Sequence, residues 1–223
     1  MTDIRISTLA KIDLLYDRSA PGHYGVTGIP FKPFINPAFR DQCDTCFEEL
    51  AEMLATHAGL KVKAILSGGV SRAGQGTSLH HKNRAFDFDG LIFDGGAANW
   101  VATSFPVRPQ LYLGMEAVLR RHFGTVLTFD YNKAHEDHFH FDNGTAVGFK
   151  QAAKSHVIFI QNVIALIHGE RIGRDGVWGG ETDGALKALR TRLKIGPVSD
   201  VGNWKALLTE IAKAGMSADK ALR

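Results

Sequence analysis

The segments AFDFD, residues 85–89, and HFHFD, residues 138–142, decide the fold. Each alternates a polar or small residue with a phenylalanine, which is the two-residue period of a β-strand. Asp87 in the first segment and His138 and His140 in the second therefore lie on faces opposite to the phenylalanines. We expect two strands that bury aromatic rings on one side and present carboxylates and imidazoles on the other.

The segments around these strands mix helix and strand signals. Apolar residues at helical spacing predict helices over residues 41–58 and 109–122, and KVKAIL at residues 61–66 predicts a strand. Short β-like runs follow the second helix at residues 125–131. The elements do not alternate regularly as in a doubly wound parallel sheet, so the expected fold class is α+β with an antiparallel sheet.

The character of the sequence changes near residue 150. Apolar periodicity beyond it predicts helices at residues 157–168, 182–193 and 201–214. A chain of 223 residues can form one medium domain and one small domain. We therefore predict a mixed α+β domain over residues 1–150 and a small all-α domain over residues 151–223.

Composition excludes several classes of protein. The net charge of +3 suits an anionic polymer, but no cluster of lysine and arginine is dense enough for a nucleic-acid surface. No apolar run approaches the roughly 20 residues that span a bilayer, so membrane insertion is not expected. Residues 1–25 lack the apolar stretch of a signal peptide, which predicts synthesis without a recognisable leader.

The two cysteines form a Cys-x-x-Cys pair at Cys43 and Cys46. A structural zinc site with four ligands needs a second pair, and the sequence has none. The spacing could also serve a redox motif, but the expected arrangement is two small apolar residues buried on one helix face.

The histidines in and before the two strands predict a metal site. Catalytic zinc takes three nitrogen or oxygen ligands and leaves a fourth position open. His80, Asp87 and His140 could supply such a set. His135 and His138 are then free to act as general base, general acid or stabiliser of the tetrahedral intermediate. The arrangement differs from the helical H-E-x-x-H zinc motif, whose histidines lie four residues apart.

At these residues the chain resembles the extensin-like C-terminal domain, a bacterial relative of the lysostaphin, D-Ala-D-Ala peptidase and hedgehog-type zinc fold. The resemblance rests on S-x-H-x-x-x-x-A-x-D-x-x-G at residues 78–90 and on F-G-T-V-L-x-x-D-Y-N-x-x-H-x-D-H-F-H-x-D at residues 123–142. It implies that His80, Asp87 and His140 bind Zn²⁺.

The same resemblance implies roles for the remaining histidines. His138 matches the family's catalytic histidine, and His135 matches an extra histidine of the penicillin-insensitive murein endopeptidases. Arg72 matches an arginine of the family pattern that could clamp a substrate carboxylate, although it could equally hold its own loop through backbone carbonyls. Where the family usually has Gly-Asn, this chain has Asn83 and Arg84, which places the local backbone geometry in question.

The C-terminal part resembles a three-helix peptidoglycan-binding domain through D-G-x-W-G-x-x-T at residues 175–182. The resemblance makes Trp178 a candidate for substrate binding. The alternative interpretation is a turn closed by glycine and followed by Thr182 as the N-cap of a helix, which only packs helices together.

Together these features predict a zinc-dependent peptidoglycan peptidase, in the first place an endopeptidase that cleaves stem-peptide or cross-link amides with zinc-activated water. The alternatives are a D,D-carboxypeptidase and a non-catalytic wall-binding module. The expected partner is peptidoglycan in the periplasm or cell wall. The chain would arrive there as a phage lysis enzyme, through a secretion system as an antibacterial effector, or as a periplasmic remodelling enzyme whose leader is missing. As an effector it would have an immunity or delivery protein as a further partner.

Overall fold

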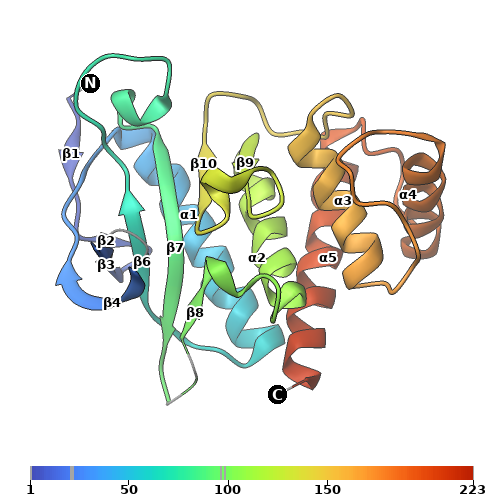
Figure 1. The fold of residues 1–223 in the computed structure, drawn as a ribbon, viewed down its shortest axis with the longest axis horizontal. Coiled ribbons are helices and arrows are strands. Elements are labelled where there is room, and N and C mark those ends of the chain that lie inside the picture. Colours follow the sequence, from blue (N-terminus) through green and yellow to red (C-terminus); the bar gives the residue numbers. More distant parts are fainter. Residues whose placement is uncertain (1, 21–22, 96, 98, 223) are drawn as a thin grey trace.

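The computed structural model describes residues 2–20, 23–95, 97 and 99–222. A mostly antiparallel sheet in the N-terminal half is followed by a helical C-terminal part, as predicted (Figure 1). The strands are β1 Ile4–Arg5, β2 Thr8–Leu9, β3 Ile12–Ala20, β4 His23–Pro30, β5 Phe34–Ile35, β6 Val62–Gly69, β7 Ala85–Phe93, β8 Trp100–Val101, β9 Thr125–Leu127 and β10 Phe139–Asp142. The helices are α1 Pro37–Met53, α2 Pro109–His122, α3 Lys154–Leu166, α4 Gly180–Leu193 and α5 Val201–Ala221.

The main sheet has the strand order β2-β3-β6-β7-β10-β9, with β4 paired to β3 and β8 paired to β7. Its pairs are antiparallel except for β3 and β6, which run parallel because the chain crosses over through α1 between them. The expected β-like run at residues 125–131 is shorter than predicted, since β9 ends at Leu127. In the central pair, β7 and β10, His140 lies directly opposite Asp87.

One face of this central pair is aromatic, as the alternation predicts. Phe86 stacks on Phe141 with ring centroids 5.3 Å apart, and Phe88 stacks on Phe139 at 5.8 Å. Phe47 of α1 meets the edge of Phe88 at 5.4 Å, which joins the helix to the sheet. Because the phenylalanines are buried in this core, the alternate residues are held on the opposite face.

Helix α1 begins after Asn36, whose side chain accepts a hydrogen bond from the backbone N–H of Phe39, and continues as one π-helical turn over Leu54–Ala58. Cys43 and Cys46 lie on its buried face as free thiols, and burial raises the pKa of both well above the ordinary value. Because thiolates are the reactive form of cysteine, these residues are core residues, in agreement with the prediction.

Helix α5 packs along α2 (Figure 1). The backbones approach closely where Gly114 of α2 faces Gly215 of α5. Nearby, the Arg108 guanidinium donates to both carboxylate oxygens of Asp219, at 2.9 and 2.8 Å. The helical part and the sheet part thus share one hydrophobic core, and the domain boundary near residue 150 stays a prediction.

The motif at residues 175–182 is organised around Gln161 of α3. The Gln161 amide donates to Asp175 Oδ1 at 2.9 Å and to Thr182 Oγ1 at 3.1 Å, and its oxygen accepts from the backbone N–H of Gly176 at 2.8 Å. The prediction that Thr182 caps the helix is wrong. Helix α4 begins at Gly180 with Gly179 as its N-cap, and Thr182 lies inside the helix, where its hydroxyl accepts a hydrogen bond from the buried Gln161.

Among the described residues, no helix combines the length and the apolar character that crossing a bilayer requires.

Candidate metal centre

The loop before β7 brings His80 to the open face of the sheet. Ser78 caps a short 3-10 helix, Leu79–Lys82, and its hydroxyl accepts from the backbone N–H of His80 at 3.4 Å. Asn83 ends the helix with a φ of +54°. Asparagine is one of the few residues besides glycine that adopts this left-handed conformation readily, so the departure from the family pattern is accommodated here.

Arg84, the second residue that departs from the family pattern, links the two sequence motifs through hydrogen bonds. Its guanidinium donates to Asn143 Oδ1 at 2.8 Å and to the Asn143 carbonyl oxygen at 3.2 Å. Asn143 directly follows β10, so the loop that carries His80 is fastened to the strand that carries His140.

His80, Asp87 and His140 converge on one point. His80 Nε2 lies 3.1 Å from Asp87 Oδ1 and 3.2 Å from His140 Nδ1, and His140 Nδ1 lies 3.1 Å from Asp87 Oδ1. Ligands about 2.0–2.1 Å from a tetrahedral zinc ion are separated by about 3.3 Å, so the triangle matches such a site closely. The three residues could hold a metal ion.

The second nitrogen of each imidazole has a fixed partner. His80 Nδ1 lies 3.0 Å from the carbonyl oxygen of Val70, which can only accept, so His80 carries its proton there and turns the Nε2 lone pair to the centre. His140 Nε2 lies 3.3 Å from Asp142 Oδ2. Such outer partners orient metal-binding histidines and fix their tautomers.

Charge in the triangle follows from the same contacts. Burial opposes ionisation of Asp87, but its close contacts with the His140 and His80 imidazoles outweigh burial and hold the pKa of that carboxyl well below its usual range. Burial also opposes a charge on His140, yet hydrogen bonds to Asp142 and Asp87 raise its pKa to about 9. A proton therefore competes with a metal ion for His140 Nδ1.

His138 lies beside the triangle without belonging to it. Its Nδ1 bonds to the Asp137 carboxylate, and its Nε2 is 3.5 Å from Asp87 Oδ1. The Arg18 guanidinium also lies 3.1 Å from Nδ1, but the Asp137 contact is the shorter of the two. Because a carboxylate only accepts, this contact assigns the proton to Nδ1, and Nε2 presents a lone pair toward the metal position. Burial lowers the pKa of His138, which favours the neutral ring that a general base requires.

His135 reaches the centre from the loop before β10. It ends a short 3-10 helix, Lys133–His135, and its Nδ1 lies 2.7 Å from Asn132 Oδ1. Its ring centroid is 5.2 Å from that of His138 and 5.8 Å from that of His140. Burial and these two imidazoles lower the pKa of His135 to about 4, so it is neutral at pH 7.

A cavity of about 460 Å³ opens over these side chains, and two arginines line it. Arg72 contributes an exposed side chain, while its backbone holds the loop: its N–H donates to the His80 carbonyl at 3.1 Å and its carbonyl lies 3.2 Å from His81 Nδ1. The predicted substrate-binding arginine thus lies at the cavity. Trp178 does not, and lines a different pocket in the helical part.

Sequence reasoning missed Arg18. It lies on β3, and its guanidinium is 3.2 Å from Asp89 Oδ1, 3.1 Å from His138 Nδ1 and 3.7 Å from Asp137 Oδ1. Asp89, placed by alternation on the same face as Asp87, thus pairs with this arginine. No local signal marks Arg18, because it lies far in sequence from the cavity residues and β3 joins their sheet through its pairing with β6.

Residues 61–152 match the family model of the extensin-like protein C-terminus. This segment is an extensin-like C-terminal domain. The extensin-like domain contains the whole metal triangle and both candidate catalytic histidines, whereas Arg18 lies outside it. The comparisons with curated proteins and with solved structures found no match.

The family match ends just before α3. A peptidoglycan-binding domain in the remaining residues therefore rests on the sequence motif, without support from the comparisons.

Proposed function

We propose that the protein is a zinc-dependent peptidase that hydrolyses amide bonds in the peptide part of peptidoglycan. The observation that carries the proposal is the triangle of His80 Nε2, Asp87 Oδ1 and His140 Nδ1, with neutral His138 beside it. Two imidazoles and one carboxylate form a ligand set typical of catalytic zinc. When bound there, a zinc ion would polarise the amide carbonyl and lower the pKa of a water molecule.

The chain's own residues then supply the proton transfers. Hydrolysis of an amide removes one proton from water and delivers one to the departing amine. His138 Nε2 can accept the first proton, since Asp137 keeps the proton of the ring on Nδ1 and stabilises the imidazolium that forms. His135, neutral and adjacent, is the second candidate for holding or returning a proton.

Endopeptidase action on stem peptides or cross-links is the leading form of the proposal, because the cavity lies open on the face of the sheet. The Arg72 side chain at this cavity favours a second candidate, a D,D-carboxypeptidase, because a guanidinium binds a terminal carboxylate in bidentate geometry. A non-catalytic wall-binding module would give His138 and His135 no role.

One experiment tests these forms together. Purified protein is incubated with sacculi and with soluble cross-linked muropeptides, with and without a chelator, and the products are identified by mass spectrometry. An endopeptidase separates the two stems of a dimer, whereas a carboxypeptidase releases single D-alanine. The absence of hydrolysis in the zinc-loaded protein would contradict the proposal, and activity that persists in the chelated protein would contradict the role of the metal.

The helical part and the route to the wall belong to the same proposal. A polymer-binding function there would raise the effective concentration of the enzyme on an insoluble substrate. Action as a phage lysis enzyme or as a secreted antibacterial effector fits a wall-degrading activity, and each would place the site of action in the periplasm or cell wall.

A further inference from the structure

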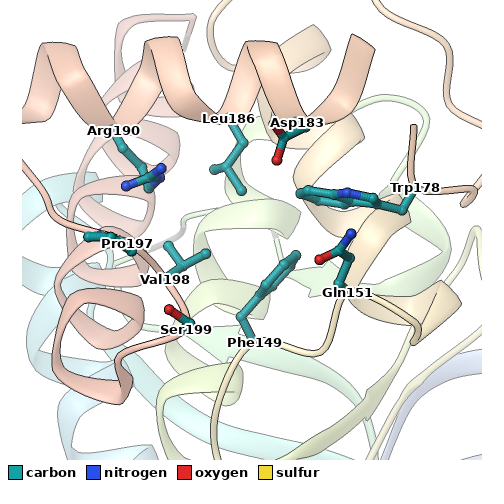
Figure 2. A pocket seen from close by; sticks show the side chains of 9 residues that line it. All are labelled: Phe149, Gln151, Trp178, Asp183, Leu186, Arg190, Pro197, Val198 and Ser199. Atoms are coloured by element: carbon teal, nitrogen blue, oxygen red, sulfur yellow. The ribbon is translucent and has the colours of Figure 1, made fainter. Parts of the chain in front are cut away.

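A second pocket, of about 240 Å³, lies between α4 and the segment that precedes α5 (Figure 2). Its lining is mixed: Gln151, Asp183, Arg190 and Ser199 supply polar groups, and apolar side chains form the rest. Phe149 and Trp178 form one side, with ring centroids 5.4 Å apart, and Leu186 of α4 and Val198 complete it. Trp178 is only half-buried, so part of its ring faces the pocket and not the core.

The two ends of the pocket carry opposite charges. Asp183 and Arg190 lie seven residues apart on α4, with Leu186 between them, and so share one face of the helix. Figure 2 shows their side chains flanking that of Leu186. Seven residues of α-helix span about 10 Å, which is the length of about three extended peptide residues.

Arg190 indicates what the pocket would bind. Its Nε is buried and has no hydrogen-bond partner among the described residues. An arginine Nε is always a donor, and a buried donor without an acceptor costs free energy. By contrast, Arg192, two residues further along α4, is exposed and paired with Glu170 at 2.8 Å. This Nε is closed to a ligand as it is to solvent, but the Arg190 side chain lines the pocket, so a ligand carboxylate at this end would pair with the guanidinium charge.

We propose that this pocket binds a short peptide segment that carries a carboxylate at one end and an ammonium group at the other. The carboxylate meets Arg190, the ammonium group meets Asp183, and an aliphatic side chain between them packs on Trp178 and Leu186. The identification of this segment as a diamino-acid-containing stem peptide of peptidoglycan rests on the proposed function. A neutral glycan would leave both charged ends without partners.

The test uses the full chain and the tripeptide L-Ala-γ-D-Glu-meso-diaminopimelate as probe. The chain has three tryptophans, and Trp100 and Trp204 are fully buried, so the indole N–H signal of Trp178 in an ¹⁵N NMR spectrum reports on the pocket. We expect this signal to shift saturably with the tripeptide. Arg190→Gln should weaken binding roughly tenfold or more, because a charge-assisted hydrogen bond is lost. Asp183→Asn, at an exposed position, should weaken it as well.

The matched control is Arg192→Gln, which removes the same charge from the same helix outside the pocket and should leave the affinity unchanged. Equal affinity in Arg190→Gln and the unmodified protein would overturn the proposal. A Trp178 shift produced by N-acetylglucosamine oligomers and not by the tripeptide would overturn it in favour of a glycan site.

Hydrolysis of soluble muropeptides, measured beside binding, separates this inference from the proposed function. Hydrolysis without a Trp178 shift would contradict peptide binding in this pocket and would leave the proposed peptidase activity standing. Tripeptide binding that depends on Arg190, without hydrolysis, would contradict the proposed peptidase activity and would leave peptide binding in this pocket standing.

Discussion

At the scale of single residues, the two histidines of HFHFD differ in what each ring nitrogen contacts. His140 turns Nδ1 into the triangle and is supported from behind by Asp142, whereas His138 turns Nε2 toward the same region and is supported by Asp137. Because the two rings lie on the same strand face, their position alone does not distinguish them. Their different neighbours distinguish His140 as the metal ligand from His138 as the proton acceptor.

His138→Ala should leave zinc content near one ion per chain and lower turnover by roughly two to four orders of magnitude, the range for a general acid–base group. His140→Ala should lose both the bound zinc and the turnover, because a metal ligand is removed. Metal analysis of the purified variants beside their turnover makes the comparison. If His138→Ala loses its zinc while His140→Ala keeps it, the two roles are reversed.

Asp142→Asn tests the outer support of the metal centre. The backbone N–H of Gly144 donates to Asp142 Oδ1 at 2.8 Å, and asparagine can keep that contact while losing the carboxylate that faces His140. We expect zinc affinity to fall about 10- to 100-fold, as for other outer partners of metal-bound histidine. Competition with a calibrated chelator measures the affinity, and an unchanged value would show that Asp142 does not support His140.

At the scale of elements, the crossing of α2 and α5 depends on two glycines. A Cβ on Gly215 would lie 2.5 Å from the Gln110 carbonyl oxygen and 3.1 Å from the Gly114 nitrogen, and both contacts are with backbone. Neither atom can move without displacing a helix. This crossing attaches the helical C-terminal part to the helix that packs beside the sheet.

Gly215→Ala should therefore destabilise the protein by about 1–3 kcal/mol or more, the cost of overpacking a close-packed interior. Gly184→Ala is the matched control, because Gly184 lies within α4 and a Cβ there would meet nothing within 4 Å. The control should gain up to about 1 kcal/mol from helix propensity. Urea unfolding of both variants checks the prediction, and a stabilised Gly215→Ala protein would show that the helices do not approach as described.

At the scale of the whole molecule, His156 links the sheet part to the helical part. Its Nδ1 accepts from the backbone N–H of Lys150 at 3.2 Å, its Nε2 faces the Gly124 carbonyl at 3.4 Å, and its ring stacks on Trp204 of α5. Burial and the nearby Arg120 lower its pKa to about 3. Folding therefore requires the neutral ring.

The pKa of His156 in the folded protein lies below the ordinary value of 6.5. The stability that the protein gains by burying the neutral His156 ring is therefore present above pH 6.5 and is lost as pH falls toward 3. The loss approaches about 1.4 kcal/mol per pH unit, so it reaches about 2 kcal/mol between pH 7.5 and pH 5. His156→Gln should lack this component. Urea unfolding of the unmodified protein and of His156→Gln at both pH values tests this prediction. Equal losses in the free energy of unfolding of the two proteins would assign the acid sensitivity to other groups.

The sequence by itself determined the local features of this protein. Alternation with a period of two placed Phe86 and Phe141 in the core and Asp87 and His140 on the opposite face, because side-chain direction in a strand is a property of neighbouring residues. Helical spacing placed α2 at residues 109–122, with the bounds that the structure has. The candidate ligands followed from these faces and from the family resemblance.

Only the tertiary structure decided which distant residues meet. The register of β7 and β10 sets Asp87 opposite His140, and the parallel pairing of β3 with β6 brings Arg18 to His138 across 120 positions of sequence. The packing of α5 on α2 and the separation of Trp178 from the metal cavity are decided in the same way. Periodicity reports which side of an element is buried, whereas the partner of that side depends on packing between segments far apart in the chain.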